Sequence, residues 1–168
     1  SGTGVPARLE LVNAAQKQVS FGPVRVNSVN SKEIKIINRS KKELPVQICF
    51  SADRVNTLFL DVSPKGLFTL RPRETKAVQV VFSPLRRVAE FEEPVLATYA
   101  GMTTQLFVIH GKAEGVEASL DTDCMNFGTV SEGSQRTKRL HLLNTGDLPV
   151  TFLWRTDTFG RYFVVNPL

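Results

Sequence analysis

The two histidines, His110 and His141, are the residues best suited to metal binding or proton transfer, because imidazole does both near neutral pH. Neither has a cysteine or a second histidine at the spacing of a zinc site. Both lie in segments whose apolar residues alternate as they do in strands. We therefore expect ordinary strand residues, with no metal or other cofactor.

Glu90, Glu92 and Glu93 form an acidic cluster. A pair of carboxylates can act as general acid and base where an apolar pocket raises the pKa of one of them. The surrounding residues predict no such pocket, and we expect a solvated loop over residues 83–93. The glycines match no phosphate-binding pattern. The sequence therefore predicts a protein that is not an enzyme.

The basic residues of the chain are unevenly distributed. Residues 1–115 hold 16 Lys and Arg against 10 Asp and Glu, whereas residues 116–168 hold 5 against 6. Most of the excess lies in three expected turns: Arg39, Lys41 and Lys42 in the first, Arg71 and Arg73 in the second, and Arg86 and Arg87 in the third. These side chains are either solvated turn residues or a patch for an acidic partner.

Two other classes of partner are not expected. Single-stranded nucleic acid is bound through aromatic side chains interleaved with basic ones, and that interleaving is missing here. No apolar run approaches the roughly 18 residues that span a bilayer. The sequence therefore predicts protein partners, with neither nucleic acid nor a membrane among them.

A repeat decides how the chain is organised. The matched positions are apolar residues and turn formers, which chance would not select. They are residues 21–22 with 127–128 and 34–38 with 140–144, at a shift of 106, and then 44–46 with 148–150 after a two-residue difference in loop length. A unit of about 100 residues has the size of an immunoglobulin-type sandwich, and it is far longer than a solenoid repeat.

The repeat also predicts the domain boundaries. Residues 7–115 are expected to form one complete domain. Residues 116–168 are expected to be the N-terminal half of a second, because residues 162–167 match residues 59–64, after which the first domain continues for about 50 residues. Residues 1–6 are expected to be the end of a preceding repeat or a linker, with a purification-tag remnant as the alternative for Ser1-Gly2.

Apolar residues alternate with polar ones along most of residues 8–112, which is the pattern of half-buried strands. Turn formers such as Pro64-Lys65-Gly66 separate the alternating runs. The predicted strands cover residues 8–12, 18–24, 32–38, 44–51, 58–63, 75–82, 94–100 and 103–112. Eight short strands and almost no helix predict an all-β fold, a tandem of immunoglobulin-like β-sandwiches.

Several motifs resemble those of the ASH domain family, which is related to major sperm protein and to PapD-like domains. They are Phe-Gly-Pro-Val at 21–24, Leu-Pro-Val at 44–46, Ser-Pro-Lys-Gly-Leu-Phe-Thr-Leu-Arg-Pro at 63–72, and Val-Gln-Val-Val-Phe-Ser-Pro at 78–84. The resemblance implies a scaffold in a microtubule-associated assembly such as the ciliary axoneme and its central pair, with tubulin, axonemal proteins and neighbouring repeats as partners. It also leaves an alternative open: a receptor that binds acidic motifs on a sheet face or adds a strand to a sheet edge.

The strand order predicts where the positive charge points, because the loops of a sandwich collect at its two ends. We expect the loops at 39–43 and 64–74 to lie at one end, near the turn at Gly101. The candidate partner-binding residues, Arg39, Lys41, Lys42, Arg71 and Arg73, would then converge. Arg86 and Arg87 would be remote, in the loop at 83–93, and partly offset by its glutamates.

Cys49 and Cys124 are predicted to be free thiols, because they fall in different repeats and a disulfide needs Cα atoms within about 7 Å. Antibody domains instead carry a cysteine pair with a tryptophan between its members. The absence of that pair favours a reducing, cytoplasmic compartment. Thiol titration of the unfolded, unreduced protein should return two thiols per chain, and a smaller number would contradict the prediction.

Overall fold

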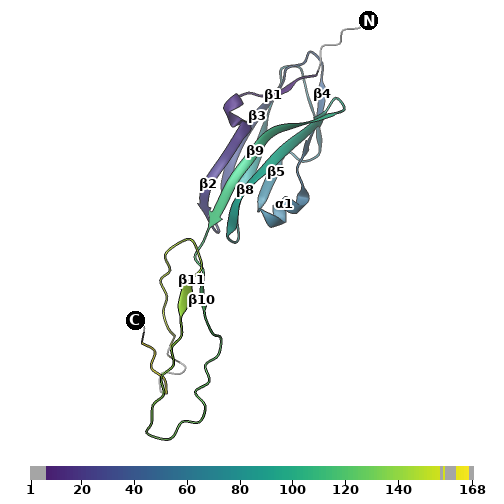
Figure 1. Ribbon diagram of the computed structural model, residues 1–168. Helices are drawn as coiled ribbons and strands as arrows, with labels where there is room; N and C mark the ends of the chain where they lie inside the picture. The colour runs from purple at the N-terminus through teal and green to yellow at the C-terminus, as the bar shows by residue number, and fades with distance from the viewer. Residues whose placement is uncertain (1–6, 156, 158–161, 167–168) are drawn as a thin grey trace. The chain divides into compact units, whose positions relative to one another are not determined.

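The computed structural model describes residues 7–155, 157 and 162–166, so the segment expected to end a preceding repeat, residues 1–6, lies outside them. The chain divides into two compact units, Ser1–Gly115 (unit 1) and Val116–Leu168 (unit 2) (Figure 1). The two units are described in turn. Unit 1 is a β-sandwich of two sheets and is all-β apart from two short helical turns.

The first sheet of unit 1 has four antiparallel strands in the order β1-β3-β7-β5. They are β1 (Leu9–Leu11), β3 (Asn30–Asn38), β5 (Leu60–Ser63) and β7 (Thr75–Phe82). Alternation sets which side chains face inward: Ile34 and Ile36 are fully buried on β3, whereas Glu33 and Lys35 are exposed. Val78, Val80 and Phe82 form the neighbouring row of buried side chains on β7, in the same sheet. Period-two patterning therefore determines which face of this sheet packs on the core.

The second sheet has five strands in the order β2-β9-β8-β4-β6. They are β2 (Gln18–Arg25), β4 (Leu44–Cys49), β6 (Leu67–Leu70), β8 (Val88–Tyr99) and β9 (Met102–Glu114). The aromatic ring of Phe82 connects the sheets, with ring centroids 5.6 Å from Phe21 and 5.4 Å from Phe91. Such tilted and edge-on contacts add to the burial energy of the core.

The N-terminal part of unit 1 contributes to both sheets. β1 pairs with β3 in the first sheet, a 3-10 turn at Ala14–Lys17 follows, and β2 then pairs with β9 in the second. The β2–β9 pairing is parallel, from Gln18 beside Val108 to Arg25 beside Glu114, with one irregularity after Ser20. The first and last long strands of the unit are therefore direct neighbours.

The structure departs from the sequence prediction in three places. Residues 64–74 are not one loop, because β6 occupies the middle of that range. β8 begins at Val88, so Glu90, Glu92 and Glu93 lie on a strand and not in a loop over residues 83–93. A short helix, α1 (Ala52–Thr57), follows β4 where the prediction extended the strand to residue 51. Polar residues run through the first half of β8, which hides it from a search for alternation.

Unit 2 begins in the same way as unit 1. β10 (Ala118–Leu120) pairs antiparallel with β11 (Leu142–Asn144), and Ala118 lies opposite Asn144 as Leu9 lies opposite Asn38. The next backbone bond is repeated as well: Thr145 N donates to Glu117 O, as Arg39 N donates to Arg8 O. The repeat in the sequence is thus a repeat in the hydrogen bonding of the backbone.

Unit 2 exposes positions that unit 1 buries. Phe152 and Phe163 are 49% and 47% exposed, whereas their counterparts Ile48 and Leu60 are 8% and 0% exposed. Trp154 is half-buried, with its ring centroid 5.8 Å from that of Phe152. Residues 162–166 correspond to residues 59–63, so counterparts of β6, β7, β8 and β9, which complete the core of unit 1, are not among the described residues of unit 2.

Asp121 and His141 make a two-point contact at the end of the β10–β11 pair. His141 N lies 3.0 Å from Asp121 Oδ1, and His141 Nδ1 lies 2.7 Å from Oδ2. The main-chain bond first, and the side-chain bond second, hold the pKa of the Asp121 carboxyl below its ordinary value of 3.8. This contact stabilises the folded state above the unfolded pKa and is lost as the pH falls through the lowered value.

Replacing His141 by Ala should raise the pKa of Asp121 only part of the way to its ordinary value, because the larger cause is the main-chain N–H of residue 141. An NMR titration of the Asp121 carboxyl carbon measures this directly. Lys138→Ala, which removes a cation that lies over Phe127, serves as the control and should leave the pKa unchanged. Complete recovery in His141→Ala, or an ordinary pKa in the wild type, would contradict the assignment.

Candidate partner-binding surface

The five predicted site residues lie in two loops at one end of unit 1. In the β3–β7 pairing, Ile37 lies opposite Thr75, so the loop after β3 and the loop before β7 begin side by side. The β8–β9 turn is at the same end, since Tyr99 lies opposite Val46 near the start of β4. Residues 39–43 and 71–74 therefore form one surface, whereas residues 64–66 lie farther along the sandwich, where the chain crosses from β5 to β6.

The side chain of Asn38 holds the two loops together. It is fully buried, and its Nδ2 lies 2.9 Å from Lys42 O, 3.0 Å from Leu70 O and 3.2 Å from Arg71 O. Its Oδ1 accepts a bond of 2.9 Å from Ser40 N and also contacts the Ser40 hydroxyl. One carboxamide thus satisfies backbone groups of both loops that no strand pairs, and we call this arrangement the Asn38 junction.

Main-chain bonds complete the junction. Arg73 N donates to Asn38 O at 2.8 Å, and Asn38 N donates to Glu74 O at 3.1 Å. Glu74 Oε2 accepts a bond of 2.6 Å from Arg71 N, which closes the loop on itself. The backbones of both loops are therefore fixed, while the side chains of Lys41, Lys42, Arg71 and Arg73 are exposed.

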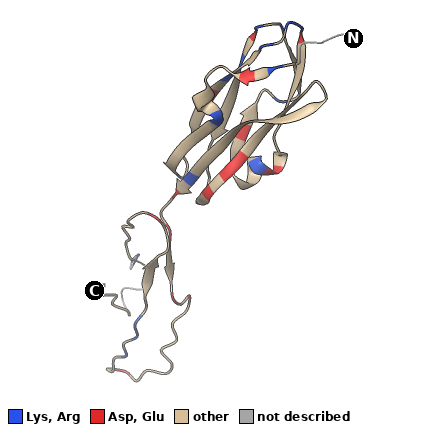
Figure 2. Cartoon of the chain, turned by 45° about the horizontal axis from the view of Figure 1, so that its top comes forward, with Lys and Arg blue, Asp and Glu red and all other residues tan. Residues whose placement is uncertain are grey.

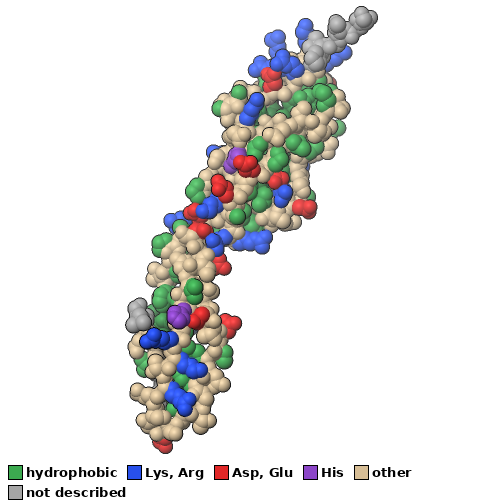
Figure 3. All heavy atoms as spheres, viewed as in Figure 1, with side chains coloured by type: hydrophobic (Ala, Val, Ile, Leu, Met, Phe, Trp, Pro, Cys, Tyr) green, Lys and Arg blue, Asp and Glu red, His purple; other side chains and the backbone are tan. Residues whose placement is uncertain are grey.

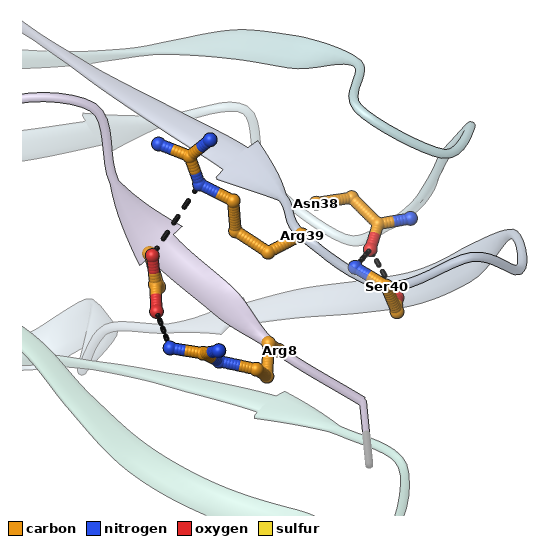
Figure 4. A network of polar contacts seen from close by, with 5 residues as sticks. Arg8, Asn38, Arg39 and Ser40 are labelled. Carbon is orange, nitrogen blue, oxygen red and sulfur yellow. Dashed lines mark hydrogen bonds and ion pairs between the residues drawn. The ribbon is translucent and has the colours of Figure 1, made fainter. Parts of the chain in front are cut away.

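Arg39 has a different role from the other four. Glu10 on β1 receives two guanidinium groups, Arg8 at 2.5 Å and Arg39 at 3.4 Å (Figure 4). All three side chains are substantially exposed, so each ion pair contributes little to stability. The ion pair with Glu10 nevertheless neutralises part of the charge of Arg39, and it connects β1 to the end of β3.

We call the remaining four residues, Lys41, Lys42, Arg71 and Arg73, the basic surface. Among the described residues, none of their side chains has an acidic partner. The segments 8–10, 39–43 and 71–74 together hold six Lys and Arg against three Glu, a net charge of +3. Figure 2 shows the backbone positions of Lys and Arg at this end of unit 1, and Figure 3 shows their side chains gathered there with few acidic ones among them.

The opposite end of unit 1 carries Arg86 and Arg87. Phe82, the last residue of β7, lies opposite Asn30 at the start of β3, so Arg86 and Arg87 lie far from the basic surface. The guanidinium of Arg86 lies over the ring of Phe59, 5.5 Å from its centroid. Two glutamates of β8 have specific partners, Glu93 with Arg54 at 3.1 Å and Glu92 with His110 at 3.3 Å, and acidic residues follow one another along this strand in Figure 2.

The other side chains that could take part in chemistry are a histidine and two cysteines, and their surroundings are those of ordinary structural residues. His110 on β9 lies between Gln18 and Glu92. Cys49 is half-buried, 3.3 Å from the Thr98 hydroxyl, and Cys124 is exposed; neither is in a disulfide. Within the described part of the chain, no group of three or more His, Cys, Asp or Glu could hold a metal ion. In the same part, none of the helices is long and apolar enough to span a membrane.

The local turn bonds of Asn38 recur in unit 2 without the basic residues. Asn144 Nδ2 donates to Leu148 O at 2.9 Å, and Gly146 N donates to Asn144 Oδ1 at 3.0 Å, the same spacings along the chain as around Asn38. These bonds stay within one loop, and Asn144 is exposed. By alignment, Thr145 replaces Arg39, and the loop of unit 2 is two residues shorter, without a counterpart of the pair Lys41-Lys42. The turn therefore forms without the basic residues.

The sequence predicted the two loops and their charges, but not the role of Asn38 as a hydrogen-bonding centre. Its amide is the largest fully buried polar side chain of the described residues. A signal was available: a polar residue ends the strand directly after a pair of apolar residues at both Asn38 and Asn144. Side chains of this type are retained at buried positions when they satisfy several backbone groups at once.

Comparison with known proteins identifies the class. The family described as the fourth Ig-like domain of CFAP74 matches residues 14–117, more than half of the chain, so the chain belongs to this family of immunoglobulin-like domains. The ASH/PapD-like domain 7 of human CEP192 has the same fold, with a TM-score of 0.51 over 69% of this chain and 92% of that one, at 15% identity. The predicted ASH-type sandwich is confirmed.

The sequence relatives are long proteins, and several of them are named as cilia- and flagella-associated proteins. The human hydrocephalus-inducing protein homolog is 30% identical over 169 residues, which cover 99% of this chain, and mouse cilia- and flagella-associated protein 65 is 28% identical over 156 residues, which cover 90%. The chain spans only 3% and 8% of the lengths of these relatives. It is therefore an ASH/Ig-like segment similar to part of the hydrocephalus-inducing protein.

Replacing Asn38 by Ala should lower the free energy of unfolding of unit 1 by about 2–4 kcal/mol, because three carbonyls lose their donor and one N–H its acceptor. Asn144→Ala, at an exposed position, should cost less than about 1 kcal/mol. Urea unfolding followed by circular dichroism measures both changes. Equal losses for the two variants would show that burial of the junction does not matter.

Proposed function

We propose that the chain is a non-enzymatic scaffold segment of a ciliary assembly, and more specifically of the axoneme and its central pair. Family membership and the names of the relatives support the setting. The observation that carries the proposal is the asparagine turn that occurs at both Asn38 and Asn144 with different charges around it. A conserved frame whose surface changes from one repeat to the next is what a scaffold with several partners requires.

In this proposal the basic surface contacts an acidic protein, and the acidic tail of tubulin is the candidate within an axoneme. Exposed cations in fixed loops attract such a partner over a Debye length of about 8 Å at physiological salt. Neighbouring repeats of the same protein, and other axonemal proteins, are the remaining partners proposed. A cytoplasmic and cytoskeletal location follows from this setting.

The alternative, a receptor of the major-sperm-protein type, has less support from the geometry. The outer side of the five-stranded sheet carries neutral polar groups at its centre, where the hydroxyls of Thr98 and Thr103 are 2.9 Å apart beside Cys49. On the same sheet, Lys112 is paired with Glu114 at 2.9 Å. Three of the four edge strands, β1, β5 and β6, have three or four residues, a length that limits strand addition. The fourth, β2, has eight residues, but Gly22 at φ +63° and the register shift after Ser20 interrupt it. These features do not favour binding of an acidic motif or an added strand.

Microtubule co-sedimentation at low salt tests the proposed contact. The chain should pellet with microtubules, and Lys41→Ser combined with Lys42→Ser should weaken its binding about threefold to tenfold, since two exposed ion pairs contribute up to about 1 kcal/mol each. The matched control, Arg86→Ser with Arg87→Ser, removes the same charge from the opposite end and should change binding less. The quadruple change of Lys41, Lys42, Arg71 and Arg73 to Ser should weaken binding further.

Two results would contradict the proposed contact: no binding by the wild type at low salt, or equal losses for the two double variants. Microtubules whose acidic tails have been removed by limited proteolysis should bind less of the wild-type chain. For the central pair, axonemes that lack it should retain less of the chain than complete axonemes. Equal retention would place the scaffold elsewhere in the axoneme.

A further inference from the structure

Arg73 has a backbone conformation that disfavours an arginine. Glu74 N donates to Arg71 O at 3.0 Å, so residues 71–74 form a β-turn with Pro72 and Arg73 at its centre. The φ angle of Arg73 is +62°, in the left-handed region. With Pro at the second position of such a turn, a positive φ at the third position strongly favours Gly, because a Cβ atom raises the energy there.

Glycine occupies five other positions of positive φ among the described residues, and Asn27, Phe59 and Ala100 occupy three more. The main chain of Arg73 is held by the bond from its N–H to Asn38 O. The Arg73 side chain is exposed, and among the described residues it makes no hydrogen bond, ion pair or aromatic contact that offsets the backbone cost. A side chain kept at such a position without a contact in the fold is a candidate for a function outside it.

The Lys41-Lys42 pair provides a second, independent argument for a role of the basic surface. Unit 2 forms its Asn144 junction with a loop two residues shorter, so the insertion is not needed to close the turn. In unit 1 the inserted backbone is nevertheless held, because Lys42 O accepts a bond from Asn38 Nδ2. The insertion thus adds two exposed ammonium groups on a fixed frame, beside Arg71 and Arg73.

We propose that the basic surface is a preformed site for a carboxylate-rich peptide segment, and that Arg73 is its specificity-determining residue. The inference rests on the proposed function and names the chemistry of the partner. Guanidinium groups bind carboxylates with two parallel hydrogen bonds, and the lysines add charge on the neighbouring loop. Because the backbone is already ordered, binding does not require the loops to fold.

The composition of the two loops favours a peptide over other anionic partners. Residues 39–43 and 71–74 contain no aromatic side chain on which a base could stack, and Pro72 is their one apolar residue. A membrane surface would require apolar side chains beside the cations for firm attachment. Nucleic acid and anionic lipid are therefore treated as competing outcomes of the test.

The test measures affinity and stability on the same variants of the whole chain. Fluorescence anisotropy at low salt with a labelled oligoglutamate peptide gives the dissociation constant, and an oligoglutamine peptide of equal length is the uncharged comparison. Arg73→Gly should weaken binding about threefold to fivefold, the effect of one exposed charge pair, while its melting temperature stays equal to that of the wild type or rises. Arg86→Ser, at the opposite end, should bind as the wild type does.

A loop graft provides a second variant that is expected to fold. Replacing residues 39–43 by the Thr-Gly-Asp of unit 2 keeps the spacing at which Asn144 forms its junction, so folding should survive while oligoglutamate binding is lost. Arg73→Lys keeps the charge but not the two-bond geometry, and its affinity should fall between those of the wild type and Arg73→Gly.

Any of several outcomes would overturn the inference. They are a lower melting temperature for Arg73→Gly, unchanged peptide affinity in that variant, equal binding of oligoglutamine, or tighter binding to single-stranded DNA or anionic vesicles than to oligoglutamate. Microtubule binding without oligoglutamate binding would overturn this inference and leave the proposed function intact. Oligoglutamate binding without microtubule binding would contradict the proposed contact with microtubules and leave the inferred peptide site intact.

Discussion

The carboxamide of Asn38 lies between the loops that follow β3 and β6, and it binds the carbonyls of Lys42, Leu70 and Arg71. The side chain itself is fully buried. An unsatisfied buried polar group costs about as much as several surface ion pairs contribute. The positions of the two loops that carry the basic surface therefore depend strongly on a single uncharged amide.

This dependence separates two kinds of residue at the same end of the fold. Asn38 and Asn144 make the same local turn bonds in the two units, and each follows a pair of apolar residues. The basic residues that follow Asn38 have no counterparts after Asn144. Because frame and surface are specified by different residues, a repeat can change its partner without changing its fold.

The fold was predictable because its strands alternate and because its repeat aligns residue by residue. Val78, Val80 and Phe82 show the pattern of a half-buried strand without any structure at hand. The first half of β8 was missed since Glu90, Glu92 and Glu93 interrupt the apolar pattern on an exposed part of the strand. The basic loops could be located, but the positive φ of Arg73 could not, because residue type argues against it.

The parallel pairing of β2 with β9 has a mechanical consequence. Once β1 has separated from β3, tension along the chain pulls unit 1 by the start of β2 and by the end of β9, two parallel strands that lie side by side. The force then acts along the strands in opposite directions, so the bonds between Gln18–Ser20 and Pro23–Arg25 of β2 and their partners on β9 are loaded together in shear. They cannot open one after another, as they would in a hairpin pulled from its open end. In a sandwich connected in this way, the paired strands β2 and β9 provide the resistance to stretching.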